Sequence, residues 1–197
     1  FLPLIEGTIY DLSTFAGART EARGWRVDLS GGAGGNSFRF DVDNSNNASF
    51  GLGSRTQFTA GTLVNRQYTT NLDAAREDRP GGRPVRSALG AEFRVDEYQI
   101  LAGDPDSYQN GGVRVLDASG NQTGRLAAVG AQVFPGFQPS DATKRSRSAV
   151  SAYGDVEVDV TPRWLVNGAL RFENFTDFGS TTNGKLASRY NVARGVV

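Results

Sequence analysis

Residues 148–159 read Ser148-Ala149-Val150-Ser151-Ala152-Tyr153-Gly154-Asp155-Val156-Glu157-Val158-Asp159. Small and apolar residues such as Val150 and Val156 alternate along this stretch with polar ones such as Asp155 and Glu157. Successive side chains of a β-strand point to opposite faces of the sheet. The stretch therefore predicts a strand with one apolar face and one charged face.

The same alternation recurs along the chain, broken by turn residues such as Pro80-Gly81-Gly82 and Thr161-Pro162-Arg163. It predicts about seven strands, at residues 8–20, 24–35, 61–77, 84–101, 146–159, 164–177 and 183–192. The expected connections are short at 21–24, 78–84, 160–163 and 178–182, and long at 36–60 and 102–145. Short turns at one end of a sheet and long loops at the other are typical of outer-membrane barrels, although 178–182 is short where a long loop is expected. We interpret the run Gly31-Gly32-Ala33-Gly34-Gly35 as a strand end or a patch of small residues rather than a phosphate loop.

A half-apolar strand fits either a soluble β-sandwich or a barrel whose apolar face meets lipid. Several predicted strands run about 12 or more residues, whereas soluble strands average about 5–6. Trp25, Trp164 and Phe175 near strand ends suit an interfacial girdle. We therefore predict an all-β fold, an antiparallel up-and-down meander that is part of a transmembrane β-barrel and does not close by itself. In that fold the apolar positions Leu89, Phe93, Val150, Val156, Val166 and Leu170 are exposed on the outer face.

Composition excludes several classes of function. Lys and Arg number 21 and Asp and Glu number 21, so the basic excess of a nucleic-acid-binding protein is missing. There is no Cys and no His, which removes disulfides, thiolate metal sites and the commonest general base. We expect no catalytic residue, no metal site and no cofactor. The chain also has no Met and opens Phe1-Leu2-Pro3, so we expect an internal piece of a longer protein.

Residues 171–190 read Arg171-Phe172-Glu173-Asn174-Phe175-Thr176-Asp177-Phe178-Gly179-Ser180-Thr181-Thr182-Asn183-Gly184-Lys185-Leu186-Ala187-Ser188-Arg189-Tyr190. This hairpin resembles one found in TonB-dependent outer-membrane receptors, where a strand R-[FY]-E-x-[FY]-x-D-F-G returns as K-x-[AS]-x-R-[FY]. Shorter segments at 65–76, 91–94, 136–141 and 150–155 resemble the same family. The resemblance is specific in the second half of the chain and looser in residues 1–60.

The resemblance implies a barrel of about 22 strands filled by an N-terminal plug. It implies a receptor in the Gram-negative outer membrane that imports a siderophore, cobalamin or an oligosaccharide. The implied partners are outer-membrane lipid, TonB, the receptor's own plug and a small-molecule or glycan ligand, with no nucleic acid. We find no plug-like segment and no TonB box, so residues 1–197 are expected to be a partial barrel domain. The alternative function is a soluble or surface-attached β-rich binding or adhesion module.

The connection 102–145 contains the candidate ligand-binding residues, because aromatic rings stack on sugars and chelates and amides hydrogen-bond to them. These residues are Tyr108, Gln109, Asn110, Phe134 and Phe137. A loop that packs on its own aromatic side chains explains the same composition. The predicted inward face carries charges that we interpret as a cross-strand ladder. They are Glu92, Arg94, Asp155, Glu157, Arg171, Glu173, Lys185 and Arg189.

Overall fold

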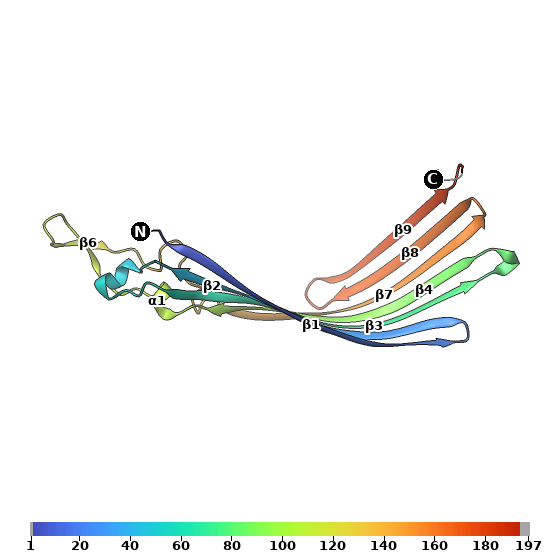
Figure 1. The fold of residues 1–197 in the computed structure, drawn as a ribbon, viewed down its shortest axis with the longest axis horizontal. Helices are drawn as coiled ribbons and strands as arrows, with labels where there is room; N and C mark the ends of the chain where they lie inside the picture. Colours follow the sequence, from blue (N-terminus) through green and yellow to red (C-terminus); the bar gives the residue numbers. More distant parts are fainter. Residues whose placement is uncertain (1, 194–197) are drawn as a thin grey trace. The chain divides into compact units, whose positions relative to one another are not determined.

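The computed structural model describes residues 2–193. Seven long strands lie side by side in one sheet in the order β1-β2-β3-β4-β7-β8-β9 (Figure 1). Their bounds are β1 (Leu4–Ala22), β2 (Trp25–Asp43), β3 (Phe58–Asp78), β4 (Val85–Ala102), β7 (Thr143–Thr161), β8 (Trp164–Phe175) and β9 (Gly179–Tyr190). Each of these seven strands pairs with the ones that come before and after it in the order just given. The predicted all-β antiparallel meander is therefore confirmed, and the barrel is not closed.

Each predicted strand is present, but most are longer than predicted. β2 runs unbroken through the glycine-rich residues 31–35 to Asp43, so the expected connection 36–60 shrinks to residues 44–57. The prediction of a strand end in this run was wrong. Hydrogen bonds to β1 and β3 on both sides hold the backbone extended, so the weak strand preference of glycine is overridden.

The two faces of the sheet differ in exposure as the alternation predicts. The apolar residues Val150, Val156 and Leu170 are 57%, 46% and 59% exposed, whereas Asp155 and Glu157 on the polar face are half-buried. Leu89 and Phe93 are exposed too, while Val166 is half-buried. Because these apolar side chains are exposed, no second sheet covers them within residues 2–193, which excludes the sandwich.

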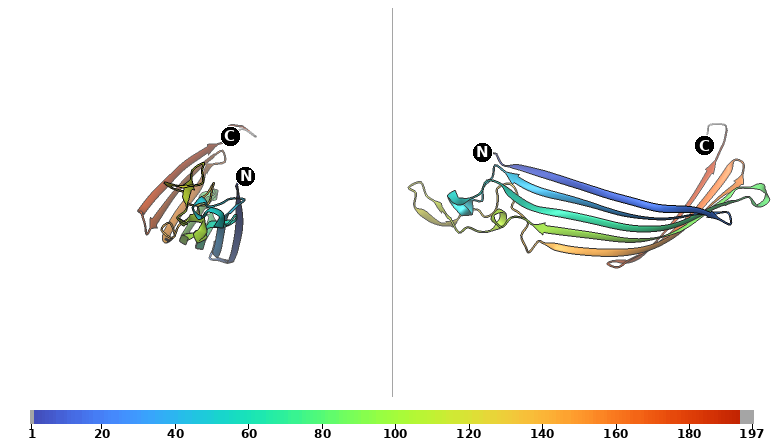
Figure 2. Two further views of the ribbon diagram at one scale, coloured as in Figure 1. Left: turned by 90° about the vertical axis from the view of Figure 1, so that its left-hand side faces the viewer. Right: turned by 60° about the horizontal axis from the view of Figure 1, so that its bottom comes forward.

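The described chain divides into two compact units, and the strands β1 to β4 and β7 contribute to both. Among the described residues, the first unit comprises 2–12, Gly35–Arg66 and Glu97–Arg145, and the second comprises Ser13–Gly34, Gln67–Asp96 and 146–193. The first contains the 3-10 helix η1 (Ala48–Gly53), the short helix α1 (Pro105–Tyr108) and a two-stranded sheet of β5 (Arg114–Leu116) and β6 (Gln122–Leu126). These pieces gather beside the strand ends near the N-terminus (Figure 2).

The second unit holds the short turns. Arg23 and Gly24 join β1 to β2 with φ values of 51° and 81°, the positive values of a type I′ hairpin turn. The 3-10 helix η2 (Pro80–Gly82) joins β3 to β4, and Pro162 and Arg163 join β7 to β8. The predicted short connections at 21–24, 78–84 and 160–163 are therefore confirmed.

In the first unit the polarity of β2 inverts. Phe38, Phe40 and Val42 lie at alternate positions of β2 and therefore on the same face of the strand as Asn36, and Val42 is fully buried. On the opposite face Arg39 pairs with Asp41 at 2.8 Å. The buried apolar residues of this unit are Val42, Phe58, Ala60 and Ala131.

Among residues 2–193 no helix is long and apolar enough to cross a membrane.

Candidate functional site

The connection between β4 and β7 is more ordered than the loop predicted at 102–145. It contains α1 and the β5–β6 hairpin, in which Arg114 pairs with Leu126 and Leu116 pairs with Gln122. The signal for this hairpin is in the sequence, since Asp117-Ala118-Ser119-Gly120 is a turn composition between two short apolar-containing runs. The Asp117 carboxylate accepts hydrogen bonds from the backbone N–H groups of Asn121 and Ser119, at 2.9 and 2.8 Å. These bonds, that from Asn121 foremost, lower the pKa of Asp117 below its usual value.

Both ends of this connection are fastened to the start of β3. The Asp104 backbone N–H donates to the Thr59 carbonyl at 2.7 Å, and the Asp104 carboxylate accepts from the Thr59 N–H at 3.0 Å. At the other end, the Phe137 N–H donates to the Ala60 carbonyl at 2.8 Å, and the Phe137 carbonyl accepts from Gly103 at 2.9 Å. The segment between them is therefore held on a fixed base.

The predicted site residues Phe134 and Phe137 lie together in a cluster of aromatic rings. Their ring centroids are 5.7 Å apart, and each ring also contacts Phe40 of β2, at 5.2 and 6.0 Å. Phe38 packs edge-on against Phe40 at 4.4 Å. Gly61, with a φ of 127°, leaves room for the Phe137 ring, which a Cβ atom at that position would meet. All four rings are half-buried, so the cluster closes the base of the loops while part of each ring stays accessible.

The other three predicted site residues lie on a different element from this cluster. Tyr108 ends α1 and is half-buried, and it joins none of the ring pairs found among residues 2–193. Gln109 and Asn110 follow it with exposed side chains. The carbonyl oxygen of Asn110's side chain accepts from the Gly112 N–H at 2.9 Å, which uses one of its polar atoms in a local turn. The structure thus places the five residues in two groups.

The two connections of the first unit are bonded to each other through Asn47, which sequence reasoning missed. Asn47 is fully buried, and its side-chain amide donates to the carbonyls of Asp106 and Gln109. Nearby, the Gln132 N–H donates to the Asn46 carbonyl at 3.1 Å, and Asn47 and Ala131 form an isolated β-bridge. An Asn within the run Asn44-Ser45-Asn46-Asn47 carries no local sign of such a role, because its partners lie about 60 residues away.

The polar face of the second unit carries a continuous ion-pair network. Arg171 on β8 lies 3.0 Å from Glu173 and 3.5 Å from Glu92 on β4, and donates to the Ser151 hydroxyl on β7 at 3.1 Å. Ser151 is small enough for the guanidinium to reach across β7. From Glu92 the chain of charges continues through Arg94, Asp96, Arg147 and Asp177, at 3.8, 3.4, 3.0 and 3.9 Å.

The predicted charge ladder is thereby confirmed for Glu92, Arg94, Arg171 and Glu173, and Glu157 makes a separate cross-strand pair with Arg86 at 2.8 Å. Asp155 accepts from the amide of Asn167 at 2.9 Å. Lys185 and Arg189 make none of the ion pairs found among residues 2–193. Because these side chains are partly exposed, individual pairs contribute little to stability. The network instead gives the face a fixed pattern of charge.

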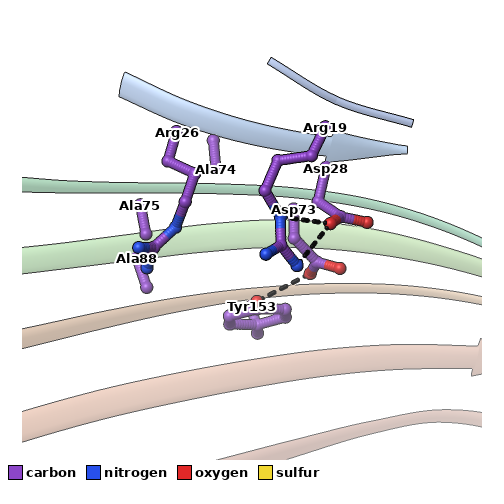
Figure 3. A pocket seen from close by; sticks show the side chains of 8 residues that line it. All are labelled: Arg19, Arg26, Asp28, Asp73, Ala74, Ala75, Ala88 and Tyr153. Atoms are coloured by element: carbon purple, nitrogen blue, oxygen red, sulfur yellow. Dashed lines mark hydrogen bonds and ion pairs between the residues drawn. The ribbon is translucent and has the colours of Figure 1, made fainter. Parts of the chain in front are cut away.

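A hollow of about 300 Å³ opens on the same polar face (Figure 3). Small side chains leave the space, and charged ones surround it; the lining residues are Arg19, Arg26, Asp28, Asp73, Ala74, Ala75, Ala88 and Tyr153. Arg19 pairs with Asp28 at 2.8 Å, and the Tyr153 hydroxyl donates to Asp73 at 2.7 Å. Positive and negative charges balance in the lining, so the hollow does not favour ions of one sign.

The described part of the chain offers no set of side chains that could bind a metal ion. No group of three or more His, Cys, Asp or Glu side chains in residues 2–193 converges on a point where an ion would sit. The two groups of predicted binding residues and the charged face are therefore the features that bear on function.

The chain is similar to a known protein family and to a solved structure. The family model described as "TonB dependent receptor-like, beta-barrel" matches residues 5–196. A search of curated proteins gave no match. Among solved structures, the siderophore receptor PirA from Acinetobacter baumannii superposes with a TM-score of 0.58 at 18% identity, over 95% of this chain and 24% of that one. That similarity concerns the fold alone, and the chain spans about a quarter of the length of PirA. The family match over nearly the whole chain shows that this protein belongs to the TonB-dependent receptor β-barrel family, a family of outer-membrane receptors and transporters rather than enzymes.

Proposed function

We propose that the chain forms part of the barrel wall of a Gram-negative outer-membrane receptor that imports a scarce nutrient. The observation that carries this proposal is the exposed apolar face, with Val150, Val156 and Leu170 about half exposed or more, set against a charged inner face. A soluble protein rarely exposes an apolar band of this kind, whereas a barrel wall turns it to lipid. The adhesion-module alternative leaves this face without a partner.

The ligand that we propose is a siderophore, with cobalamin or an oligosaccharide as the alternatives. PirA, whose fold this chain shares, is described as a siderophore receptor, which favours a ferric chelate. In the full-length protein, the proposed partners are the plug inside the barrel and TonB, which would energise import. Outer-membrane lipid would cover the apolar face.

We further propose that residues 102–145 contact the ligand from outside the membrane. Tyr108, Gln109 and Asn110 present their side chains from a segment whose backbone is fastened, and Phe134 and Phe137 keep part of each ring accessible. Rigid presentation favours binding, because less conformational entropy is lost when the ligand arrives. An aromatic and amide surface can stack on and hydrogen-bond to a chelate or a glycan.

The experiment measures binding of a ferric tris-catecholate and a ferric tris-hydroxamate chelate to the full-length receptor in detergent, with cobalamin and a maltooligosaccharide for comparison. Gln109→Ala and Tyr108→Ala are expected to weaken binding at least about fivefold, the effect of losing a central contact. The matched control is Gln122→Ala, which removes an exposed amide from β6 of the same connection.

Equal affinity for Gln109→Ala, Tyr108→Ala and the control would remove these residues from the site. Full-length protein that stays monodisperse without detergent would instead favour the soluble module. Binding of cobalamin or the oligosaccharide in preference to both chelates would reassign the ligand class and leave the receptor function intact.

A further inference from the structure

A single buried side chain ties the two connections of the first unit together. Asn47 is fully buried, and all of its side-chain polar atoms are used. Its Nδ2 donates to the Asp106 carbonyl and the Gln109 carbonyl, both at 2.9 Å. Its Oδ1 accepts from the N–H of Ser49 at 3.2 Å and from the Ser49 hydroxyl at 2.6 Å.

Ser49 extends this contact to the next residues of the same segment. Its hydroxyl accepts from the Gly111 N–H at 2.9 Å, and its carbonyl accepts from the Val113 N–H at 3.0 Å. A Cβ atom at Gly111 would meet the Ser49 carbonyl and the Phe50 ring, so the two backbones are in close approach. Residues 106–113 are thus bonded at four points to the pair Asn47 and Ser49, which we name the loop clamp.

The loop clamp holds the segment through its backbone. The contact at Gln109 uses the carbonyl, while the Gln109 side chain is exposed and takes no part. The residues proposed to contact the ligand are therefore fixed by bonds that leave the side chains of Tyr108 and Gln109 free of the clamp. Such an arrangement separates the group that positions from the groups that bind.

We propose that Asn47 is a positioning residue: it fixes the conformation of residues 106–111 in the unliganded receptor, and thereby sets the affinity of the surface that Tyr108 and Gln109 present. The second half of this statement rests on the proposed function. Without the amide, the carbonyls of Asp106 and Gln109 lose the donor that the fully buried Asn47 side chain supplies, and a polar group left unpaired beside it is costly. The segment then opens to water to satisfy those carbonyls.

Asn47→Asp is the sharpest test because it keeps the size of the side chain and the acceptor for Ser49, and removes only the Nδ2 donors. The carboxylate would also face two carbonyl oxygens. The matched control is Asn44→Asp, three positions away and exposed, whose Nδ2 donates to the Leu2 carbonyl and not to residues 106–113. Both variants are made in the full-length receptor.

The first readout is hydrogen exchange of peptides covering residues 105–116, measured without ligand. Asn47→Asp should raise exchange of the amides of Gln109 and Gly111 about 5- to 100-fold, the consequence of losing the two hydrogen bonds that Asn47 donates to this segment. Asn44→Asp and Gln109→Ala should leave these amides unchanged. Unchanged exchange in Asn47→Asp overturns the proposal, whatever the receptor binds.

The second readout is the kinetics of binding the ferric tris-catecholate chelate. A disordered segment must be ordered at each encounter, so Asn47→Asp should lower the association rate more than Gln109→Ala does, whereas Gln109→Ala should chiefly raise the dissociation rate. Faster exchange with unaltered binding kinetics would overturn the link to affinity while leaving the clamp itself in place. If the wild-type receptor binds none of the probes, the proposed function fails, and hydrogen exchange still decides on the clamp.

Discussion

The hydroxyl of Tyr153 on β7 donates a 2.7 Å hydrogen bond to Oδ1 of Asp73 on β3, although β4 lies between these two strands. The bond passes over Gly90 of β4, where a Cβ atom would collide with both the Asp73 carboxylate and the Tyr153 ring. Glycine inside a strand commonly marks such a close approach. Arg171 crosses β7 over Ser151 in the same manner to reach Glu92. The polar face therefore joins strands that are not hydrogen-bonded neighbours.

Gly90→Ala should destabilise the full-length receptor by about 1–3 kcal/mol, since the added methyl group overpacks the crossing. Tyr153→Phe should cost about 1 kcal/mol, because it removes the bond but keeps the ring. The midpoint of urea unfolding in lipid vesicles measures both. Combining the two substitutions should cost clearly less than their sum, as both act on one contact. Strict additivity would contradict a shared crossing.

Leu170 and Ala169 are neighbours on β8 and lie on opposite faces of the sheet. Leu170→Arg places a charge on the exposed apolar face and should destabilise the barrel by about 2–4 kcal/mol if that residue lies near the middle of the bilayer. Ala169→Arg is the matched control, because Ala169 lies on the polar face directly opposite Asp155 and Lys185 in the register. It should change stability by less than about 1 kcal/mol. Unfolding in lipid vesicles makes the comparison, and a larger cost at position 169 would invert the assignment of the faces.

The ion pair between Arg171 and Glu92 should show weak coupling. The two side chains are 37% and 25% exposed, so solvent screens their 3.5 Å attraction. A double-mutant cycle with Arg171→Ala and Glu92→Ala should give about 0.2–1 kcal/mol at low salt. Raising the salt concentration should reduce it, because accessible charges are screened. A coupling that salt does not alter would mean that the plug or the rest of the barrel buries this pair.

The turn between β5 and β6 should be pH-sensitive. The pKa of Asp117 is lowered in the folded hairpin, chiefly by the Asn121 N–H, so the turn is stabilised at all pH values above the ordinary pKa of Asp. That stabilisation is lost as the pH falls through the lowered folded-state value. Amide exchange at Ser119 and Asn121 should therefore be slower in the wild type than in Asp117→Asn near neutral pH. The two proteins should converge under strongly acidic conditions, and a difference that persists there would assign the turn's order to another contact.

Period-two alternation was enough to predict the seven strands, because the polarity of each residue indicates which face of the sheet it lies on. Val150 and Asp155 needed no knowledge of the rest of the chain. The strand ends were harder. At Phe38 and Phe40 the apolar side chains lie on the opposite face from Trp25 and Val27 and pack against loop residues such as Phe134. The pattern that suggested the end of the strand was therefore a change in what covers each face.

The structure of the loops could not be predicted from the sequence, for a different reason. Their order depends on pairs such as Asn47 with Gln109 and Phe40 with Phe134, which lie far apart in the chain and have no periodic signature. The aromatic residues Phe134 and Phe137 were identified as notable from composition. Composition gave no means of telling that they pack against β2, while Tyr108 stands on a separate helix.

The sheet has two outer strands, β1 with 19 residues and β9 with 12. In the part of the chain that the structure describes, each of them pairs along one side only. The other side presents a row of backbone donors and acceptors, which hydrocarbon does not tolerate and which water leaves open to any extended peptide. Two such open margins on a sheet that also exposes an apolar band make the isolated chain a template for self-association. Expressed alone, it should build ribbons or amyloid-like aggregates by adding strands, whereas the same residues inside the complete barrel would use both margins to close the ring.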